Sequence, residues 1–143
     1  MSPAASTAPP PKVAVLNDSR DNVELLAAWL RHHGFSVVGA TVQEFRGSAS
    51  SFAEFVRTNR PTLLLVDVGF PYEENWAFVR SARDLVTIGH LPLIVTTTSK
   101  RILESLVGPT DALEVLAKPY DLDQVTRVVR AALTRRREDG RPT

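Results

Sequence analysis

Short apolar runs alternate with helix-like patterns along most of the chain. Between the runs, apolar residues recur every three or four positions, which is typical of amphipathic helices. The runs are continuous enough for buried strands, and these are predicted at Lys12–Leu16, Phe35–Thr41, Thr62–Val66, Leu91–Thr96 and Leu113–Ala117. Helices are predicted at 20–33, 51–60, Glu74–Leu85, Lys100–Leu106 and from Asp121 onward.

Local signals indicate where several helices begin or end. Ser51 and Glu54 form a capping-box pattern that opens the second helix. Gly108-Pro109 should end the short fourth helix. Asp121, followed three residues later by Gln124, is a cap-like start for the last helix.

The apolar stripe of each helix predicts which side chains pack on the sheet. Both tryptophans lie on such stripes, so we expect them in the core and not at a ligand site. In the first, third and last helices the stripes comprise Leu25, Leu26, Trp29, Leu30 and His33; Trp76, Phe78, Val79 and Ala82; and Leu122, Val125, Val128, Val129, Ala132 and Leu133.

This alternation favours an α/β fold with a five-stranded parallel sheet and helices on both faces. Strands of such a sheet are apolar throughout because both of their faces are buried. The number of strands suits the flavodoxin-like, doubly wound arrangement. We expect residues 12–136 to form this domain, after a flexible Pro-rich leader over 1–11 and before a charged tail over 137–143.

Composition excludes several classes of protein. The 143 residues suffice for one core, and the absence of cysteine removes disulfides, thiolate chemistry and Cys-based metal sites. A net charge of +1 gives no general attraction to nucleic acids or membranes. No apolar stretch approaches the ~20 residues of a membrane span. The first residues do not resemble a secretory signal, so we expect a cytoplasmic location.

Polar side chains follow four of the predicted strands. Asp67 follows the third strand, Asn17-Asp18 the first, Thr97 the fourth and Lys118 the fifth. The carboxyl ends of parallel strands meet at one edge of the sheet, where α/β proteins bind their ligands. The pattern therefore predicts acidic groups, a hydroxyl and an ammonium group at one rim.

In these residues the chain resembles the receiver domain of bacterial two-component response regulators. The resemblance extends from Lys12 to Arg136 and implies a stand-alone phosphoacceptor domain. It rests on these features in order: Asn17-Asp18, Pro61 six residues before Asp67, Pro71 four residues after it, Thr97 five residues after Pro92, and Lys118-Pro119-Tyr120.

The resemblance implies a role for each strand-end residue. Asp67 would be the phosphoacceptor, attacking a phosphoryl group supplied by a histidine kinase, a phosphotransfer protein or a small donor. Lys118 would pair with the phosphoryl oxygens, and Thr97 would donate its hydroxyl to them. Phosphoryl transfer is mostly positioning and charge neutralisation, which such a set provides. The domain would promote only its own phosphorylation and would not be an enzyme in the usual sense.

The resemblance also implies a Mg²⁺ site. Its ligands would be the carboxylates of Asp18 and Asp67 and the backbone carbonyl of Gly69, with Asn17 acting through a water molecule. Mg²⁺ prefers oxygen ligands and keeps several waters, which suits this set.

The expected output is a protein partner, a phosphorelay step or a homodimer. The chain ends soon after its last predicted helix, so we expect no DNA-binding domain and no membrane contact. By resemblance, the docking surface would lie near Lys100–Leu106, Leu113–Ala117 and the last helix.

Three positions differ from the usual receiver pattern. Receivers usually have two acids where this chain has Asn17-Asp18, so we expect weaker Mg²⁺ binding. Val115 replaces an aromatic residue, which removes the partner of the threonine in the usual conformational relay. Thr98 replaces a small residue and would slow the access of donors or water. The segment 72–75 has no chemical explanation in the sequence.

Each site residue except Asp67 also has an easy structural alternative. Asp18 could cap the first helix, Thr97 could pack its methyl group, and Lys118 could be a solvated amine in a turn. Asp67 is harder to explain this way, because an apolar run leads directly to it.

Three other functions are alternatives to a phosphoacceptor. Asn17, Val115 and Thr98 would suit a degenerate receiver that docks partners without phosphorylation. A phosphatase of the dehalogenase type needs an acid two residues after the nucleophile, where this chain has Gly69. A flavodoxin-like cofactor site needs a phosphate loop after the first strand, where residues 17–21 are acidic.

Overall fold

Five parallel strands form one sheet in the computed structural model, which describes residues 10–85, 91–107 and 114–139. Neighbouring strands are parallel in every pairing, and the order in the sheet is β2-β1-β3-β4-β5. The predicted five-stranded parallel sheet is therefore confirmed. The strands are β1 (Lys12–Asn17), β2 (Ser36–Thr41), β3 (Leu63–Asp67), β4 (Leu93–Thr97) and β5 (Glu114–Ala117).

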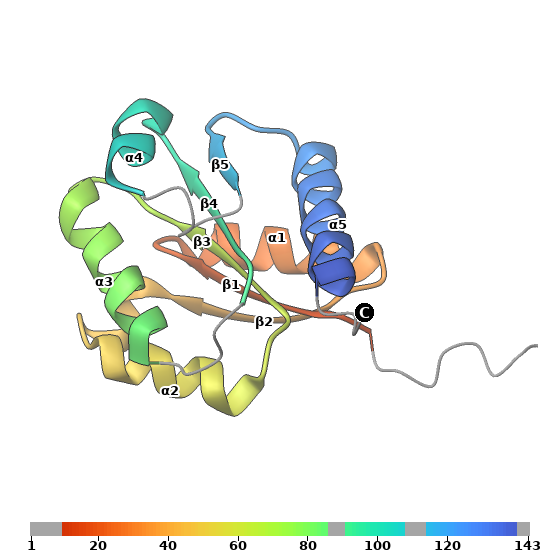
Figure 1. Ribbon diagram of the computed structural model, residues 1–143, viewed down its shortest axis with the longest axis horizontal. Helices are drawn as coiled ribbons and strands as arrows, with labels where there is room; N and C mark the ends of the chain where they lie inside the picture. The colour runs from red at the N-terminus through yellow and green to blue at the C-terminus, as the bar shows by residue number, and fades with distance from the viewer. Residues whose placement is uncertain (1–9, 86–90, 108–113, 140–143) are drawn as a thin grey trace, which may run out of the picture.

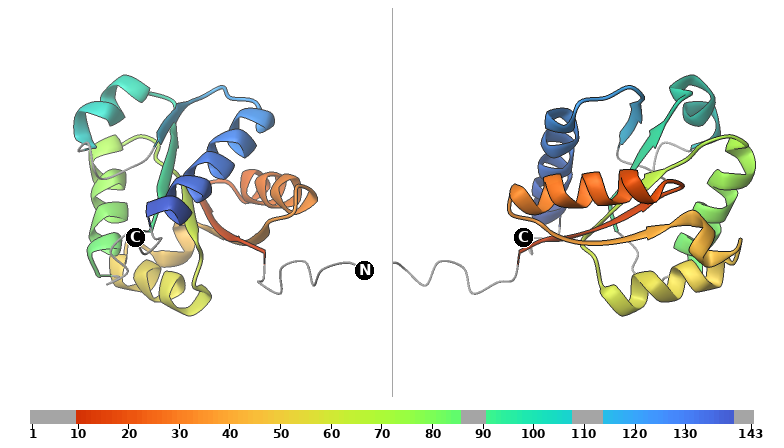
Figure 2. Two further views of the ribbon diagram at one scale, coloured as in Figure 1. Left: turned by 45° about the vertical axis from the view of Figure 1, so that its right-hand side comes forward. Right: turned by 180° about the vertical axis from the view of Figure 1, so that it is seen from behind.

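Helices cover both faces of this sheet, as Figures 1 and 2 show. In the left view of Figure 2, α3 and α4 lie on one side of the strands and α1 and α5 on the other. The doubly wound fold is thus confirmed. The helices are α1 (Arg20–His32), α2 (Ala49–Asn59), α3 (Tyr72–Leu85), α4 (Lys100–Leu106) and α5 (Leu122–Asp139), with a short 3₁₀ helix, η1 (Val42–Phe45).

The sheet divides the core into two clusters. In β3, Leu63 and Leu65 pack with α1 and α5, whereas Leu64 and Val66 pack with α2, α3 and α4. Successive side chains of a strand point to opposite faces, and here both faces are covered. This is why the strand is apolar throughout until its last residue.

Three strands extend one residue further than the sequence predicts. Asn17, Asp67 and Thr97 are the last residues of β1, β3 and β4 and do not merely follow them. The predicted ranges of β1 and β3 stop before the polar residue at their carboxyl ends and that of β4 stops at Thr96, but the pairing of the strands continues one residue further in each case. The polar side chains are therefore held on strand backbone. Strands β2, β3 and β4 also begin later than predicted, at Ser36, Leu63 and Leu93.

The predicted start of α2 is wrong. The helix begins at Ala49, and the hydroxyl of Ser48 accepts a hydrogen bond from the backbone N–H of Ser51 at 3.1 Å. Ser51 therefore lies in the first turn and is not the cap. Ser48 satisfies a free N–H group of that turn, which the sequence pattern assigned to the wrong serine.

The helix η1 was not predicted, because four residues are too few to show a period. It carries Phe45 into a group of aromatic rings formed with Phe52, Phe55 and Phe78. This group fills the space between η1, α2 and α3.

The inner stripe of α1 differs from the predicted one. Leu25 is 55% exposed, whereas Val23, Leu26, Ala27 and Leu30 are buried. Leu25 lies two positions from both Val23 and Ala27, which places it on the far side of the helix.

The other helix stripes follow the prediction closely. Trp76, Val79 and Ala82 are buried, and Phe78 is half-buried against the same cluster. Trp29 is half-buried and donates from Nε1 to the hydroxyl of Thr126 at 2.6 Å, which joins α1 to α5.

Several predicted helix ends can be compared with the structure. Asp121 caps α5 as predicted, since its Oδ1 accepts from the backbone N–H of Gln124 at 2.7 Å. Helix α3 begins at Tyr72, earlier than predicted, and α5 continues through Asp139, past the predicted domain end at 136. The predicted stop at Gly108-Pro109 lies outside the described residues. None of the helices in the described ranges has the length and apolarity to cross a membrane.

Gly39 permits the close approach of α1 to β2. A methyl group added there would lie 2.5 Å from Cγ1 of Val23, a buried side chain that is stiff because it branches at Cβ. We expect Gly39→Ala to lower the free energy of unfolding by about 1–3 kcal/mol through overpacking. Urea denaturation measures this value.

A double-mutant cycle checks the cause. Val23→Ala removes the colliding methyl groups, so the double variant should lose less stability than the sum of the two single variants. Strictly additive losses would show that the methyl clash is not the reason.

Candidate functional site

The carboxyl ends of β1, β3 and β4 meet at one edge of the sheet. In the parallel register Leu16 pairs with Val66, and Asp67 pairs with Thr96. Helix α1 leaves β1 for one face and α3 leaves β3 for the other, so the chain reverses its winding between these two strands. Ligands of open α/β sheets bind at such a reversal.

Asp67 and Lys118 come together at this edge. The side chain of Asp67 is only 5% exposed, and its Oδ1 lies 2.7 Å from Nζ of Lys118. The hydroxyl of Thr96 donates to the same Oδ1 at 2.8 Å. A carboxylate so far out of water requires such partners, because burying an unpaired charge is costly. The alternative that Lys118 is only a solvated amine is therefore wrong.

Thr97 is the last residue of β4, at the edge of the sheet where the sequence places it. Its side chain is fully buried, and its hydroxyl accepts a hydrogen bond from the backbone N–H of Ser99 at 3.2 Å. Its backbone carbonyl accepts from the N–H of Lys118 at 2.8 Å. Thr97 therefore shapes the turn after β4 and holds the backbone of the lysine.

Thr96 is a site residue that the sequence reasoning missed. It was counted as part of the apolar run of β4. The alternation of side chains contains the signal, because the preceding pair, Leu65 and Ile94, packs on the α1 and α5 face. Two residues later Asp67 and Thr96 pair in the same register, so both side chains lie on that face.

The residues after β1 divide between structure and site. Asn17 is buried, and its Oδ1 accepts from the backbone N–H of Ser19 at 3.1 Å. Ser19 is the cap of α1, with its hydroxyl accepting from the N–H of Asn22. The idea that Asp18 caps this helix is therefore wrong. Asp18 is exposed, and its backbone carbonyl accepts from Nε2 of Gln43.

A cavity of about 270 Å³ brings Asp18, Asp67 and Gly69 together. The carbonyl of Gly69 accepts from Nδ2 of Asn75 at 2.9 Å, which gives Asn75 a role that the sequence did not suggest. A carbonyl oxygen has two lone pairs, so it can still bind a cation. The cavity is also lined by Leu16, Val42, Gln43, Phe70, Pro71, Asn75, Phe78 and Val79.

This donor set fits Mg²⁺. Two carboxylates and a backbone carbonyl are oxygen ligands, and they leave positions for water or a phosphoryl group. Within the described ranges, no three acidic, histidine or cysteine side chains gather to form a different metal site.

The chain is similar to a curated regulatory protein over most of its length. No protein-family model matches the chain. The transcriptional regulatory protein PdtaR of Mycobacterium tuberculosis is 25% identical over 135 residues, which is 94% of this chain. The chain spans 62% of the length of these curated relatives.

Solved structures extend the comparison to the fold. A CheY-like response regulator receiver domain protein from Methanospirillum hungatei has a TM-score of 0.75 at 14% identity, covering 92% of this chain and 99% of that one. The chain has the receiver-domain fold. The chemotaxis protein CheY4 of Vibrio cholerae has a TM-score of 0.70 at 18% identity, covering 86% of this chain and 98% of that one.

The resemblance seen in the sequence is thus confirmed, since the chain has the fold of a receiver domain.

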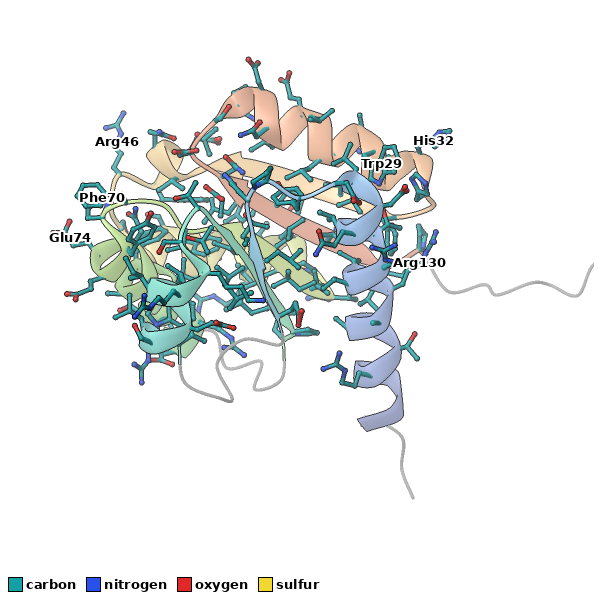
Figure 3. The ribbon with its side chains drawn as sticks, turned by 90° about the horizontal axis from the view of Figure 1, so that it is seen from above. Trp29, His32, Arg46, Phe70, Glu74 and Arg130 are labelled. Carbon is teal, nitrogen blue, oxygen red and sulfur yellow. The ribbon has the colours of Figure 1, made fainter. Side chains whose placement is uncertain are left out.

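The positions that differ from the usual receiver pattern can now be located. Val115, which replaces an aromatic residue of that pattern, is buried in the cluster under α2, α3 and α4. Thr98 is exposed, and its hydroxyl lies 2.8 Å from that of Tyr72. Phe70, which is 84% exposed, projects from the loop after β3 at the periphery in Figure 3.

The site also changes the pKa of Tyr120. Burial raises the pKa of its phenol above the usual value, and the charge of Asp67 adds to this rise. The charge of Lys118 and hydrogen bonding with the side chain of Thr96 act in the opposite direction. The phenol therefore stays neutral beside the carboxylate.

Removing the hydroxyl group of Tyr120 should change the absorbance titration and the pH dependence of stability at high pH. A group whose pKa is raised on folding contributes stability below its unfolded pKa, about 10 for tyrosine, and loses it as pH rises through the folded value. We expect Tyr120→Phe to remove a late ionisation from the near-ultraviolet absorbance titration. The variant should also lose less stability than the wild-type chain above about pH 10. An unchanged titration would contradict this assignment.

Proposed function

We propose that this chain is a phosphoacceptor receiver that takes a phosphoryl group on Asp67. The observation that carries the proposal is the environment of this carboxylate. One oxygen is held by Lys118 and Thr96, and a second acid, Asp18, lines the same cavity. A reactive acid, a fixed cation and a hydroxyl donor at one point are what phosphoryl transfer requires.

The transfer itself needs few groups. A carboxylate oxygen of Asp67 forms a bond to phosphorus while the bond from phosphorus to the donor breaks. From a phosphohistidine donor the leaving group is the histidine side chain, which takes a proton from solvent and becomes a neutral imidazole. From acetyl phosphate the leaving group is acetate. Because the nucleophile is already ionised, no separate base is needed. The domain would accelerate only this reaction on itself.

Lys118 and the two threonines would then hold the product. The ammonium group of Lys118 lies close enough to follow the negative charge onto the phosphoryl oxygens. Thr96 already donates at the carboxylate. Thr97 remains our predicted donor to the attached phosphoryl group, for which its hydroxyl would turn away from the N–H of Ser99.

Asp18, Asp67 and the carbonyl of Gly69 would hold Mg²⁺, with Asn17 acting through a water. The ion would neutralise charge on the transferring phosphoryl group. The amide of Asn17 carries no charge, and its Oδ1, which accepts from the N–H of Ser19, keeps a second lone pair for a water.

The signalling context is part of the same proposal. We propose a histidine kinase or phosphotransfer protein as the donor, and a downstream protein or a second copy of the chain as the output, in the cytoplasm. We assign residues 12–136 as the receiver unit. The similarity to PdtaR, a transcriptional regulatory protein, supports a regulatory role.

Phosphorylation is tested directly by the mass of the intact protein. After incubation with acetyl phosphate and Mg²⁺, we expect one added phosphoryl group on the wild-type chain. Asp67→Asn should gain none, because its side chain has no nucleophilic carboxylate.

A matched control separates this residue from acidic residues in general. Asp84→Asn, at an exposed position of α3, should be phosphorylated like the wild type. A folded wild-type chain that gains no phosphoryl group in excess Mg²⁺ would overturn the proposal.

Mg²⁺ binding should be weak because this chain has one acid, Asp18, where receivers usually have two. Asn17→Asp adds a carboxylate beside Asp18 and can keep the hydrogen bond to Ser19. We expect its affinity for Mg²⁺ to rise about 10-fold, as an added charge near a divalent ion should produce. Isothermal titration calorimetry of both proteins measures the change, and equal affinities would contradict the expectation.

A further inference from the structure

A hydrogen-bonded pair of hydroxyl groups connects the two loops that flank Asp67. The oxygens of Tyr72 and Thr98 lie 2.8 Å apart, although the residues are 26 positions apart in the sequence. Tyr72 begins α3 after the loop that follows β3, and Thr98 directly follows β4. These strands are neighbours in the sheet, so the pair spans the gap between their carboxyl ends.

The exposed hydroxyl pair bridges the segments after β3 and β4, whereas the cavity lies toward β1. Residues from β1, η1 and α3 line the cavity, so it opens toward the β1 side of β3. Strand β4 lies on the other side of β3. The site thus has an open side, toward Asp18, and a side that Tyr72 and Thr98 bridge.

Other contacts hold the ring of Tyr72 in this position. The ring is half-buried and packs against the core cluster of α2, α3 and α4. It also meets the ring of Phe70 edge to face, with centroids 6.1 Å apart. On the other loop, the bond from the N–H of Ser99 to the hydroxyl of Thr97 fixes the backbone next to Thr98. The hydroxyl pair therefore joins two ordered loops.

We propose that Tyr72 and Thr98 are positioning residues that close the β4 side of the site and prolong the life of the phosphoryl group on Asp67. This inference rests on the proposed phosphoacceptor function. Loss of the group requires a water oxygen to bond to phosphorus while the bond to the carboxylate oxygen breaks. The products are inorganic phosphate and free Asp67, and the water proton passes to phosphate or solvent. A closed β4 side leaves fewer positions from which water can reach phosphorus.

The pair also accounts for two features that the sequence left separate. Thr98 is larger than the residue usually found there, and Tyr72 belongs to a segment with no chemical explanation. In the structure each is the partner of the other.

Two conservative variants test the pair. Tyr72→Phe removes only the phenolic oxygen, and Thr98→Val removes only the hydroxyl while keeping the shape. After phosphorylation by acetyl phosphate and removal of the donor, intact mass follows the loss of the phosphoryl group. We expect each variant to lose it about three-fold faster, the ratio that a modest side-chain hydrogen bond can supply.

The double variant and a control make the result specific. The double variant should lose the group no faster than either single variant, because both changes remove the same bond. The rate of phosphoryl uptake should stay unchanged, since the cavity side is untouched. Thr58→Val, which removes a hydroxyl in the last turn of α2, should behave as the wild type. Unchanged loss rates in Tyr72→Phe and Thr98→Val would overturn the proposal.

A second readout does not depend on phosphorylation. The side chain of Lys118 is 25% exposed, and opening the β4 side should expose it further. We expect Tyr72→Phe to raise the rate at which an N-hydroxysuccinimide ester acylates Lys118, with Lys100 unchanged as an internal reference. If the wild-type chain takes no phosphoryl group, the proposed function fails, and this measurement alone decides whether the pair closes the site. An unchanged Lys118 rate would then overturn the closure as well.

Discussion

The ion pair between Asp67 and Lys118 is the interaction on which the site depends. Asp67 ends a strand whose other residues are all buried apolar side chains, and its carboxylate has little contact with water. Such a charge is tolerated only if a partner is fixed nearby. Lys118 is fixed because its N–H bonds the carbonyl of Thr97, so the partner exists only when β4 and β5 are both in place. The chemistry of the acid is thus tied to completion of the sheet.

Much of the fold could be predicted because both faces of the sheet are covered. Continuous apolar runs identified the strands, and polar residues at their ends indicated which edge holds the site. Boundaries were less accurate where a polar side chain stays within the sheet, as at Asn17 and Asp67. Leu25 was misplaced because an apolar residue on the outer face of a helix looks like a core residue in the sequence.

The site itself was predicted unevenly for a physical reason. Asp67 and Lys118 stood out because charged groups next to buried runs are unusual. Thr96 did not, since threonine is common in strands and only the pairing with Asp67 reveals its role. Asn75 and Tyr72 were also missed as site residues, because their partners are a backbone carbonyl and a hydroxyl distant in sequence. Such contacts depend on the conformation of the loops, which cannot be predicted from the spacing of apolar and polar residues.

The division of the core by the sheet has a consequence for which substitutions the chain can accept during evolution. A change of side-chain volume under α1 and α5 reaches the cluster under α2, α3 and α4 only if a strand itself moves. The two faces can therefore drift in sequence almost independently. The end of β4 lies at the boundary of the two clusters, because Thr96 follows Ile94 on one face and Thr97 follows Val95 on the other. Both halves of the interior thus constrain the few residues that surround Asp67.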